Sequence, residues 1–196
     1  SESFTGVFNA PLIEGVLGLR VAAYHFEDAG IIDYVSNAAI QTLADDSSNQ
    51  VRVEKDANSA TTSGIRASLL WELSDELNVN LTLGTQNQET DGANFTFDEV
   101  GVYQALGLDT PGGDTRINDT NYAGLVVNFD LGWAELTSSS SLLNTSRVNA
   151  KNLYPFQRNP FGPITNTADG ESDSVTQEFR LSSQLEGPIQ FLTGLY

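Results

Sequence analysis

The stretch that most constrains the fold is LNVNLTLGTQ, residues 77–86, in which apolar and polar side chains alternate strictly as far as Leu83. Leu77, Val79, Leu81 and Leu83 are each separated by one polar residue. A period of two matches a β-strand, whose successive side chains point to opposite faces, and does not match a helix. The run therefore predicts a strand with one apolar face and one polar face.

The same alternation recurs along the chain and predicts an all-β protein of about eight strands. It is weakest in Trp133–Ser146, where the four serines 138–141 leave the facing of the side chains open. The predicted strands are Ser3–Asn9, Val16–Phe26, Thr61–Leu73, Leu77–Gln88, Asp119–Asp130, Trp133–Ser146, Ser174–Gln184 and Ile189–Tyr196.

The links between these strands alternate between short and long. Short turns are predicted at Pro11–Gly15, at Ser74–Glu76, around Gly132 and at Leu185–Pro188. This order predicts an antiparallel up-and-down sheet with tight turns on one rim and long loops on the other. Soluble domains rarely carry several long irregular loops, whereas outer-membrane barrels do. The long links are Glu27–Ala60, Glu89–Asn118 and Arg147–Asp173.

Composition excludes several classes of function. The net charge of −17 argues against nucleic acid as a partner, because its phosphates would be repelled. The absence of cysteine and the single histidine, His25, exclude a thiolate zinc site and a histidine cluster. No nucleophile–base pair and no EF-hand spacing is present, so we expect no enzyme, cofactor or dedicated metal site. No apolar run approaches the ~18 residues of a membrane helix, so any membrane crossing would use strands.

Charge placement predicts which face of the strands is polar. Three basic residues fall inside the predicted strands, and each has the parity opposite to the apolar row of its strand. A lipid-facing Lys or Arg near the bilayer midplane costs ~2–4 kcal/mol, so a membrane barrel would turn these groups inward. The alternative is that the charged residues of this face form a ladder of opposite charges between neighbouring strands. The predicted lumen-facing residues are Arg20, Arg66, Glu72, Glu178 and Arg180.

Two tryptophans support a membrane setting. Trp71 and Trp133 lie beside predicted tight turns, where aromatic residues gather at a lipid–water interface. A soluble sandwich or lipocalin-like barrel stays open as an alternative, because alternation does not tell which face is inside.

Three segments together resemble a known family, the TonB-dependent outer-membrane receptors. They are GVFNAPLIEGVLGLRVAAYHFEDAGIIDY (Gly6–Tyr34), SGIRASLLWELSDELNVNLTLGTQ (Ser63–Gln86) and TQEFRLSSQLEGPIQFLTGLY (Thr176–Tyr196). The resemblance implies a 22-stranded transmembrane barrel with a plug domain inside it, of which residues 1–196 are an early portion without the plug or the energy-coupling box. Both end runs lack a turn signal, which also predicts a segment of a larger barrel.

The same resemblance implies a function and a location. It implies import of a scarce nutrient across the bacterial outer membrane, with energy supplied through TonB. The expected cargo is a ferric siderophore or similar iron complex, with cobalamin or an oligosaccharide as alternatives. The implied partners are outer-membrane lipid and lipopolysaccharide, the plug and remaining strands, and the TonB complex. A passive outer-membrane channel or adhesin-type barrel and a soluble ligand-binding β-domain remain the alternatives.

The third long link contains the aromatic and proline-rich segment NLYPFQRNPFGPI, residues 152–164. Aromatic rings there are candidates for stacking on a ligand, and the neighbouring cations for pairing with its anionic groups. The alternative is a loop packed on itself and stiffened by its prolines. The candidate residues are Lys151, Tyr154, Phe156, Arg158 and Phe161.

Overall fold

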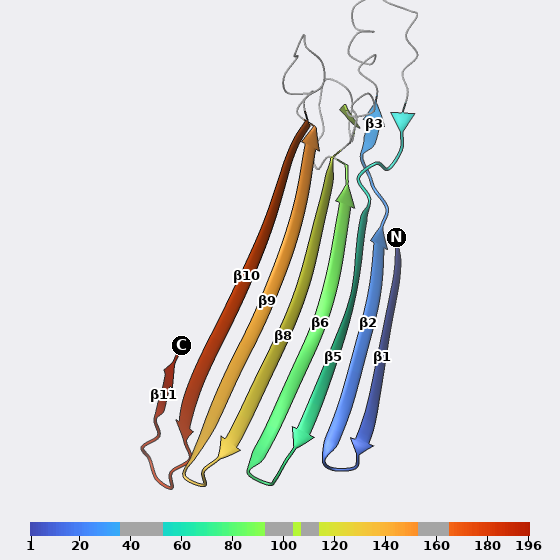
Figure 1. Ribbon diagram of the computed structural model, residues 1–196. Coiled ribbons are helices and arrows are strands. Elements are labelled where there is room, and N and C mark those ends of the chain that lie inside the picture. The colour runs from blue at the N-terminus through green and yellow to red at the C-terminus, as the bar shows by residue number, and fades with distance from the viewer. Residues whose placement is uncertain (36–52, 93–103, 107–113, 153–164) are drawn as a thin grey trace, which may run out of the picture.

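The computed structural model is built around one eight-stranded antiparallel sheet, and the described residues contain no helix (Figure 1). It describes residues 1–35, 53–92, 104–106, 114–152 and 165–196. The sheet consists of β1 (Glu2–Ile13), β2 (Leu17–Asp28), β5 (Ala60–Glu72), β6 (Leu77–Asp91), β8 (Thr115–Asp130), β9 (Ala134–Asn152), β10 (Thr165–Ser183) and β11 (Leu192–Leu195).

Strand order in this sheet follows chain order, β1-β2-β5-β6-β8-β9-β10-β11, so the predicted all-β, up-and-down meander is confirmed. All tight turns lie at one end of the sheet, and the long links leave from the other end (Figure 1). The last pairs before successive turns step along the register, from Ile13↔Leu17 through Glu72↔Asn78 to Asp130↔Glu135. Such a stagger is the geometry of strands tilted across a curved sheet.

The strands on the long-link side extend beyond the predicted bounds. β9 and β10 each have 19 residues and pair without interruption from Asn152↔Thr165 to Ala134↔Ser183. The predicted link Arg147–Asp173 was therefore wrong in extent, and the link is 153–164. The physical reason is that both faces of these strand ends are polar, so backbone pairing continues where hydrophobic alternation stops.

Two other boundaries differ from expectation. β1 continues through Pro11 to Ile13, with a register shift between them, because an edge strand tolerates a proline that cannot donate a hydrogen bond. β11 begins only at Leu192, so the first three residues of the predicted strand Ile189–Tyr196 belong to the turn. Gln190 closes that turn, because its side chain donates to the Leu185 carbonyl at 2.6 Å and accepts from Ser183 Oγ at 2.8 Å.

A small cap joins two of the long links. It contains β3 (Asp33–Val35), β4 (Val53–Glu54) and β7 (Gln104–Leu106), with β3 antiparallel to β4 and parallel to β7. Asn58 Oδ1 accepts hydrogen bonds from the amides of Ile31 and Ile32, both at 2.7 Å. The pairing of β3 with β7 thus ties the first link to the second, and the Asn58 hydrogen bonds hold the two ends of the first link together.

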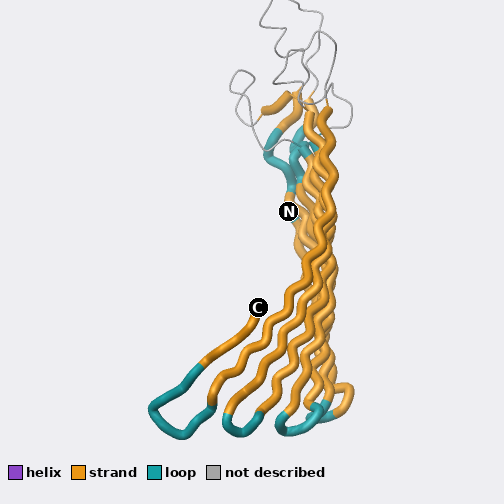
Figure 2. The backbone as a smooth tube through the Cα atoms, turned by 60° about the vertical axis from the view of Figure 1, so that its left-hand side comes forward, coloured by secondary structure: helices purple, strands orange, loops and turns teal. Residues whose placement is uncertain are grey.

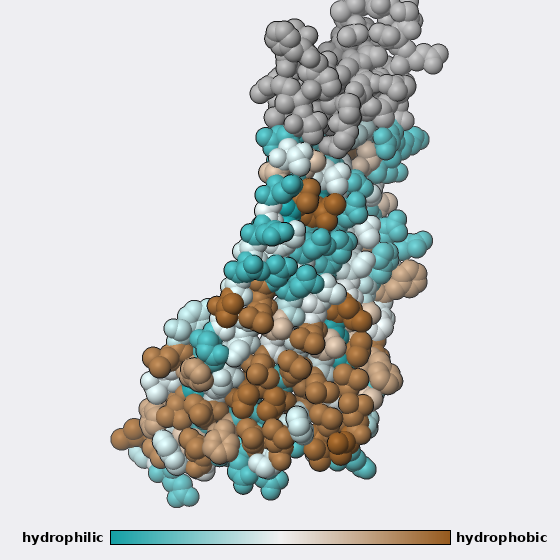
Figure 3. Space-filling view, in the orientation of Figure 1, coloured by the Kyte–Doolittle hydropathy of each residue, from teal (hydrophilic) through white to brown (hydrophobic). Residues whose placement is uncertain are grey.

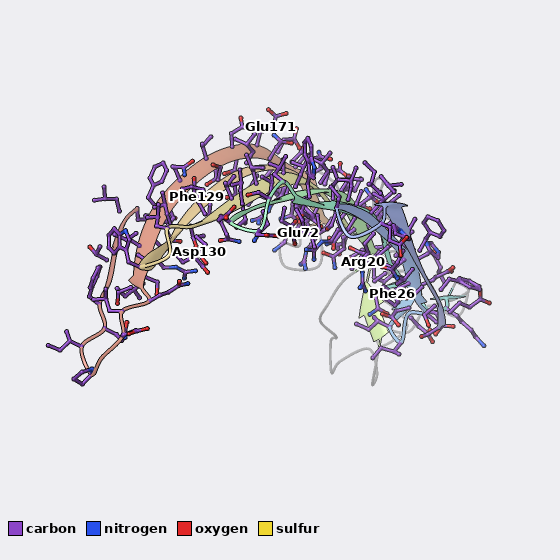
Figure 4. All side chains as sticks on the ribbon, turned by 90° about the horizontal axis from the view of Figure 1, so that it is seen from below. Arg20, Phe26, Glu72, Phe129, Asp130 and Glu171 are labelled. Atoms are coloured by element: carbon purple, nitrogen blue, oxygen red, sulfur yellow. The ribbon has the colours of Figure 1, made fainter. Side chains whose placement is uncertain are left out.

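The described part of the sheet is a single curved layer. Viewed edge-on, the sheet is bent, and its strands curve in the same direction near the turn end (Figure 2). Seen along the strands, they form an arc with side chains on both sides (Figure 4). Among the described residues the buried hydrophobic side chains are Ile32, Tyr34 and Ala134, of which the first two belong to the cap. The sheet therefore has two solvent-accessible faces and no hydrophobic core of its own.

Candidate functional site

The convex face of the sheet carries an apolar band. Residues paired across antiparallel strands point to the same side, so the register assigns each residue to a face. One register row contains Leu19, Leu69, Leu81 and Leu125, and the next contains Phe8, Val21, Ala67, Leu83, Ala123, Leu142 and Val175. Phe129 labels this side in Figure 4, and Figure 3 shows the apolar surface concentrated in the half nearest the turns.

Charged residues on the convex face occur only outside this band. Toward the long links the same strands become acidic, as Glu171 illustrates on the outer side of the arc (Figure 4). On β5 the apolar row runs from Ile65 to Trp71 and its neighbour Leu73, a span of about nine residues, or ~30 Å along the strand. Tilted by ~35–45°, such a span gives the ~25 Å band of a membrane barrel.

A shallow groove of about 700 Å³ lies on the convex face at the boundary between its apolar and polar zones. Ile65, Leu83 and Leu142 line its apolar side, and Asn121 and Asn144 line its polar side. Small Ala67 and Ala123 stand between larger neighbours, which explains the depression. It brings none of the predicted charged site residues together.

The two tryptophans lie where the sequence predicted, beside tight turns. Trp71 is on the convex face opposite Leu17 and Val79, and Trp133 lies in the turn between β8 and β9. Both remain partly exposed, at 43% and 49%. They mark the turn-side margin of the apolar band.

Polar side chains interrupt the band on β9 and β10. Ser138 and Ser140 share the convex face with Gln177, which settles the facing that the sequence left open. The Gln177 amide accepts a hydrogen bond from Ser140 Oγ and donates one to Ser138 Oγ at 3.1 Å. Pairing these groups with one another reduces the cost of placing them in an apolar surface.

The concave face is polar and contains all five charged residues predicted to share it: Arg20, Arg66, Glu72, Glu178 and Arg180. Arg20 and Glu72 are labelled on the inner side of the arc in Figure 4. These five groups therefore lie on the face opposite to the apolar band, as their parity in the strands indicated, and their exposure to a lumen stays a prediction.

The alternative role as a charge ladder receives no support from the pairing. Arg20 lies opposite Ser68, Glu178 opposite Ser139 and Arg180 opposite Thr137, rather than opposite a group of opposite charge. Neutral groups are hydrogen-bonded instead. Asn128 donates to Asn78 Oδ1 at 3.0 Å and accepts from Thr137 Oγ1 at 2.9 Å.

Tyrosine side chains cover two glycines of the concave face. Tyr24 lies over its partner Gly64 and donates a 2.6 Å hydrogen bond to Gln86 Oε1 on the following strand. Tyr122 covers its partner Gly84 in the same way. A Cβ at either glycine would overlap the ring, so this pairing fixes how the tyrosines lie across the strands.

Three further basic residues lie on this face, although the alternation pattern did not predict them to be in strands. Arg116, Arg147 and Lys151 were expected in long links, but they lie in β8 and β9 on the concave face. All six basic residues of the sheet thus share one face, which a longer strand prediction would have revealed.

Four of the candidate ligand-binding residues predicted in the third long link are not placed. Tyr154, Phe156, Arg158 and Phe161 fall in 153–164 and lie outside the described residues. Of that candidate group, only Lys151 is placed.

Two classes of feature are absent from the described ranges. They contain no group of three or more His, Cys, Asp or Glu side chains arranged to hold a metal ion. In the same ranges, no helix has the length and apolar character needed to cross a membrane.

Comparison with known proteins adds no assignment: no protein-family model, curated protein or solved structure matches this chain.

Proposed function

We propose that this chain is part of an outer-membrane β-barrel whose convex face contacts lipid and whose concave face lines the lumen. The observation that carries the proposal is the direction of curvature relative to polarity. A soluble sandwich or lipocalin-like barrel places its apolar row inside, against a core or ligand. Here the apolar band is on the outside of the arc and six cations are on the inside. An apolar outer face and a polar inner face are the pattern of a barrel that is surrounded by lipid hydrocarbon and has a polar interior.

The rim asymmetry supports the orientation within such a barrel. Short turns on one rim and long links on the other are the pattern of periplasmic turns and extracellular loops. In lipid, the free edges of β1 and β11 need backbone partners, which further barrel strands would supply. The resemblance to TonB-dependent receptors then favours a 22-stranded barrel around a plug.

Within that family the function is energy-dependent uptake of a scarce nutrient, with a ferric siderophore or similar iron complex as the first candidate. Among the described residues, five charged side chains of the concave face are exposed and make no ion pair, which supports a wall that contacts a plug or a passing polar solute: Arg20, Arg66, Glu72, Glu178 and Arg180. A passive channel would share these faces, so uptake and its energy dependence must be measured together.

Uptake is expected to fall when the gene encoding the protein is deleted. Cells would be given a labelled ferric siderophore, cobalamin or an oligosaccharide, with and without an uncoupler of the proton-motive force. We expect loss of uptake for one of the three, and loss of the same uptake when wild-type cells are uncoupled. Unchanged uptake of all three would contradict the importer, and loss that ignores the uncoupler would indicate a passive channel.

A further inference from the structure

Charge is segregated between the two faces in the long-link half of β8, β9 and β10. The concave face there presents Arg116, Arg147 and Lys151. The convex face of the same strand ends carries carboxylates and no cation. These are Asp119, Asp169, Glu171 and Asp173. Because the chain has 26 acidic and 9 basic residues, its composition alone would not predict a cluster of cations on one face.

The three cations surround a single position, Asn149. Arg116 is paired directly opposite Asn149, and Arg147 and Lys151 are its same-face neighbours on β9. Diagonal neighbours across a sheet lie within reach of long side chains, so the three charged heads can converge on one ligand. The Asn149 side chain lies between them, and its Oδ1, a hydrogen-bond acceptor, is buried without a partner.

These cations are available to a ligand. Arg147 and Lys151 are exposed and Arg116 is half-buried. Within the described ranges, no hydrogen bond or ion pair engages any of the three side chains. Three neighbouring like charges repel one another, and an anion between them removes that repulsion. Arginine binds carboxylate and phosphate through paired N–H groups, and lysine adds a point charge.

We propose that Arg116, Arg147 and Lys151 form a binding site for a small solute with several anionic groups, carboxylate or phosphate, on the concave face near the long links. The proposal deepens the proposed function, because in a barrel this place is the outer part of the lumen wall and the solute class becomes that of the cargo. The acidic convex side of the same strand ends would repel such a solute, which directs it to the concave side.

The test is calorimetric titration of the protein in detergent with citrate and with pyrophosphate, using a neutral trisaccharide as the comparison. We expect the anions to bind and the trisaccharide not to bind. Affinity should fall by about tenfold or more in Arg116→Gln/Arg147→Gln/Lys151→Gln. It should also weaken when salt rises from about 0.05 M to about 0.5 M. Binding of citrate alone would assign carboxylate, and binding of pyrophosphate alone would assign phosphate.

The matched control is Lys55→Gln, which removes one exposed cation outside the cluster and should change affinity less than about twofold. Lys151→Gln alone, at an exposed side chain, provides a second test if the triple variant fails to fold. Absence of anion binding, equal binding by the variants, or an equal loss in Lys55→Gln would each overturn the site. The titration needs no bilayer and no uptake, so its failure is distinguishable from failure of the membrane or importer proposals.

Discussion

Leu81→Arg is expected to prevent assembly into the outer membrane, whereas Thr82→Arg, one residue along the same strand, is expected to assemble. Leu81 lies on the convex face between Leu69 and Leu125, at the centre of the apolar band. An arginine there would face hydrocarbon at a cost of ~2–4 kcal/mol. That corresponds to a loss of roughly 30-fold to 1000-fold in the assembled fraction, measured as folded protein in isolated outer membranes.

Thr82 is the matched control because it points to the opposite face. It lies opposite Ser68 and Gly124, and its hydroxyl is 3.1 Å from Ser68 Oγ. An arginine at this position enters the polar concave space beside an open glycine, since no atom lies within 4 Å of a Cβ built at Gly124. Equal assembly of the two variants, or selective loss of Thr82→Arg, would contradict the assignment of faces.

Gly30→Ala is expected to release the cap from the sheet end without unfolding the sheet. A Cβ at Gly30 would overlap the backbone carbonyl of Asp56 and lie 2.8 Å from the Asn58 nitrogen. Backbone cannot rotate away as a side chain can, so the segment must shift and lose the Asn58 hydrogen bonds to Ile31 and Ile32. Overpacking of this kind costs ~1–3 kcal/mol, or about 5-fold to 150-fold in local opening.

Hydrogen exchange checks this expectation by segment. Amides of 31–35 and 53–59 should exchange faster in Gly30→Ala, while those in the middle of β5 and β6 keep their protection. Gly6→Ala is the control, because a Cβ at Gly6 meets no atom within 4 Å. Unchanged exchange in the cap, or equal loss of protection in the sheet, would show that Gly30 does not hold the cap in this way.

The meander was predictable because its signals are local. Alternation in 77–83 identifies a strand and its two faces, and the short acidic turn before it identifies a hairpin. The parity of Arg20, Arg66 and Arg180 was sufficient to place them on one face, since a strand has only two. Pairing β5 with β6 then follows from the length of the turn between them.

The strand ends near the long links were not predictable from hydrophobicity. In 165–174 both faces are polar, so no period of two in apolar residues marks the strand, although it pairs with β9 throughout. The facing of Ser138 and Ser140 required the register of two neighbouring strands. Curvature is also invisible to a local pattern, because it arises from the summed twist and tilt of all strands. Alternation therefore left the inside and outside open.

The central claim, that the convex face lies against lipid, is tested most directly by labelling β6 one residue at a time. The chain contains no cysteine, so a single cysteine introduced at each position of 77–91 carries the only spin label. In lipid vesicles, the accessibility of the spin label to oxygen should alternate along 77–83. It should be high at Leu77, Val79, Leu81 and Leu83 and low at the residues between them. From Thr85 onward the high values should no longer occur. High accessibility at the even-numbered residues, or no alternation, would contradict the account.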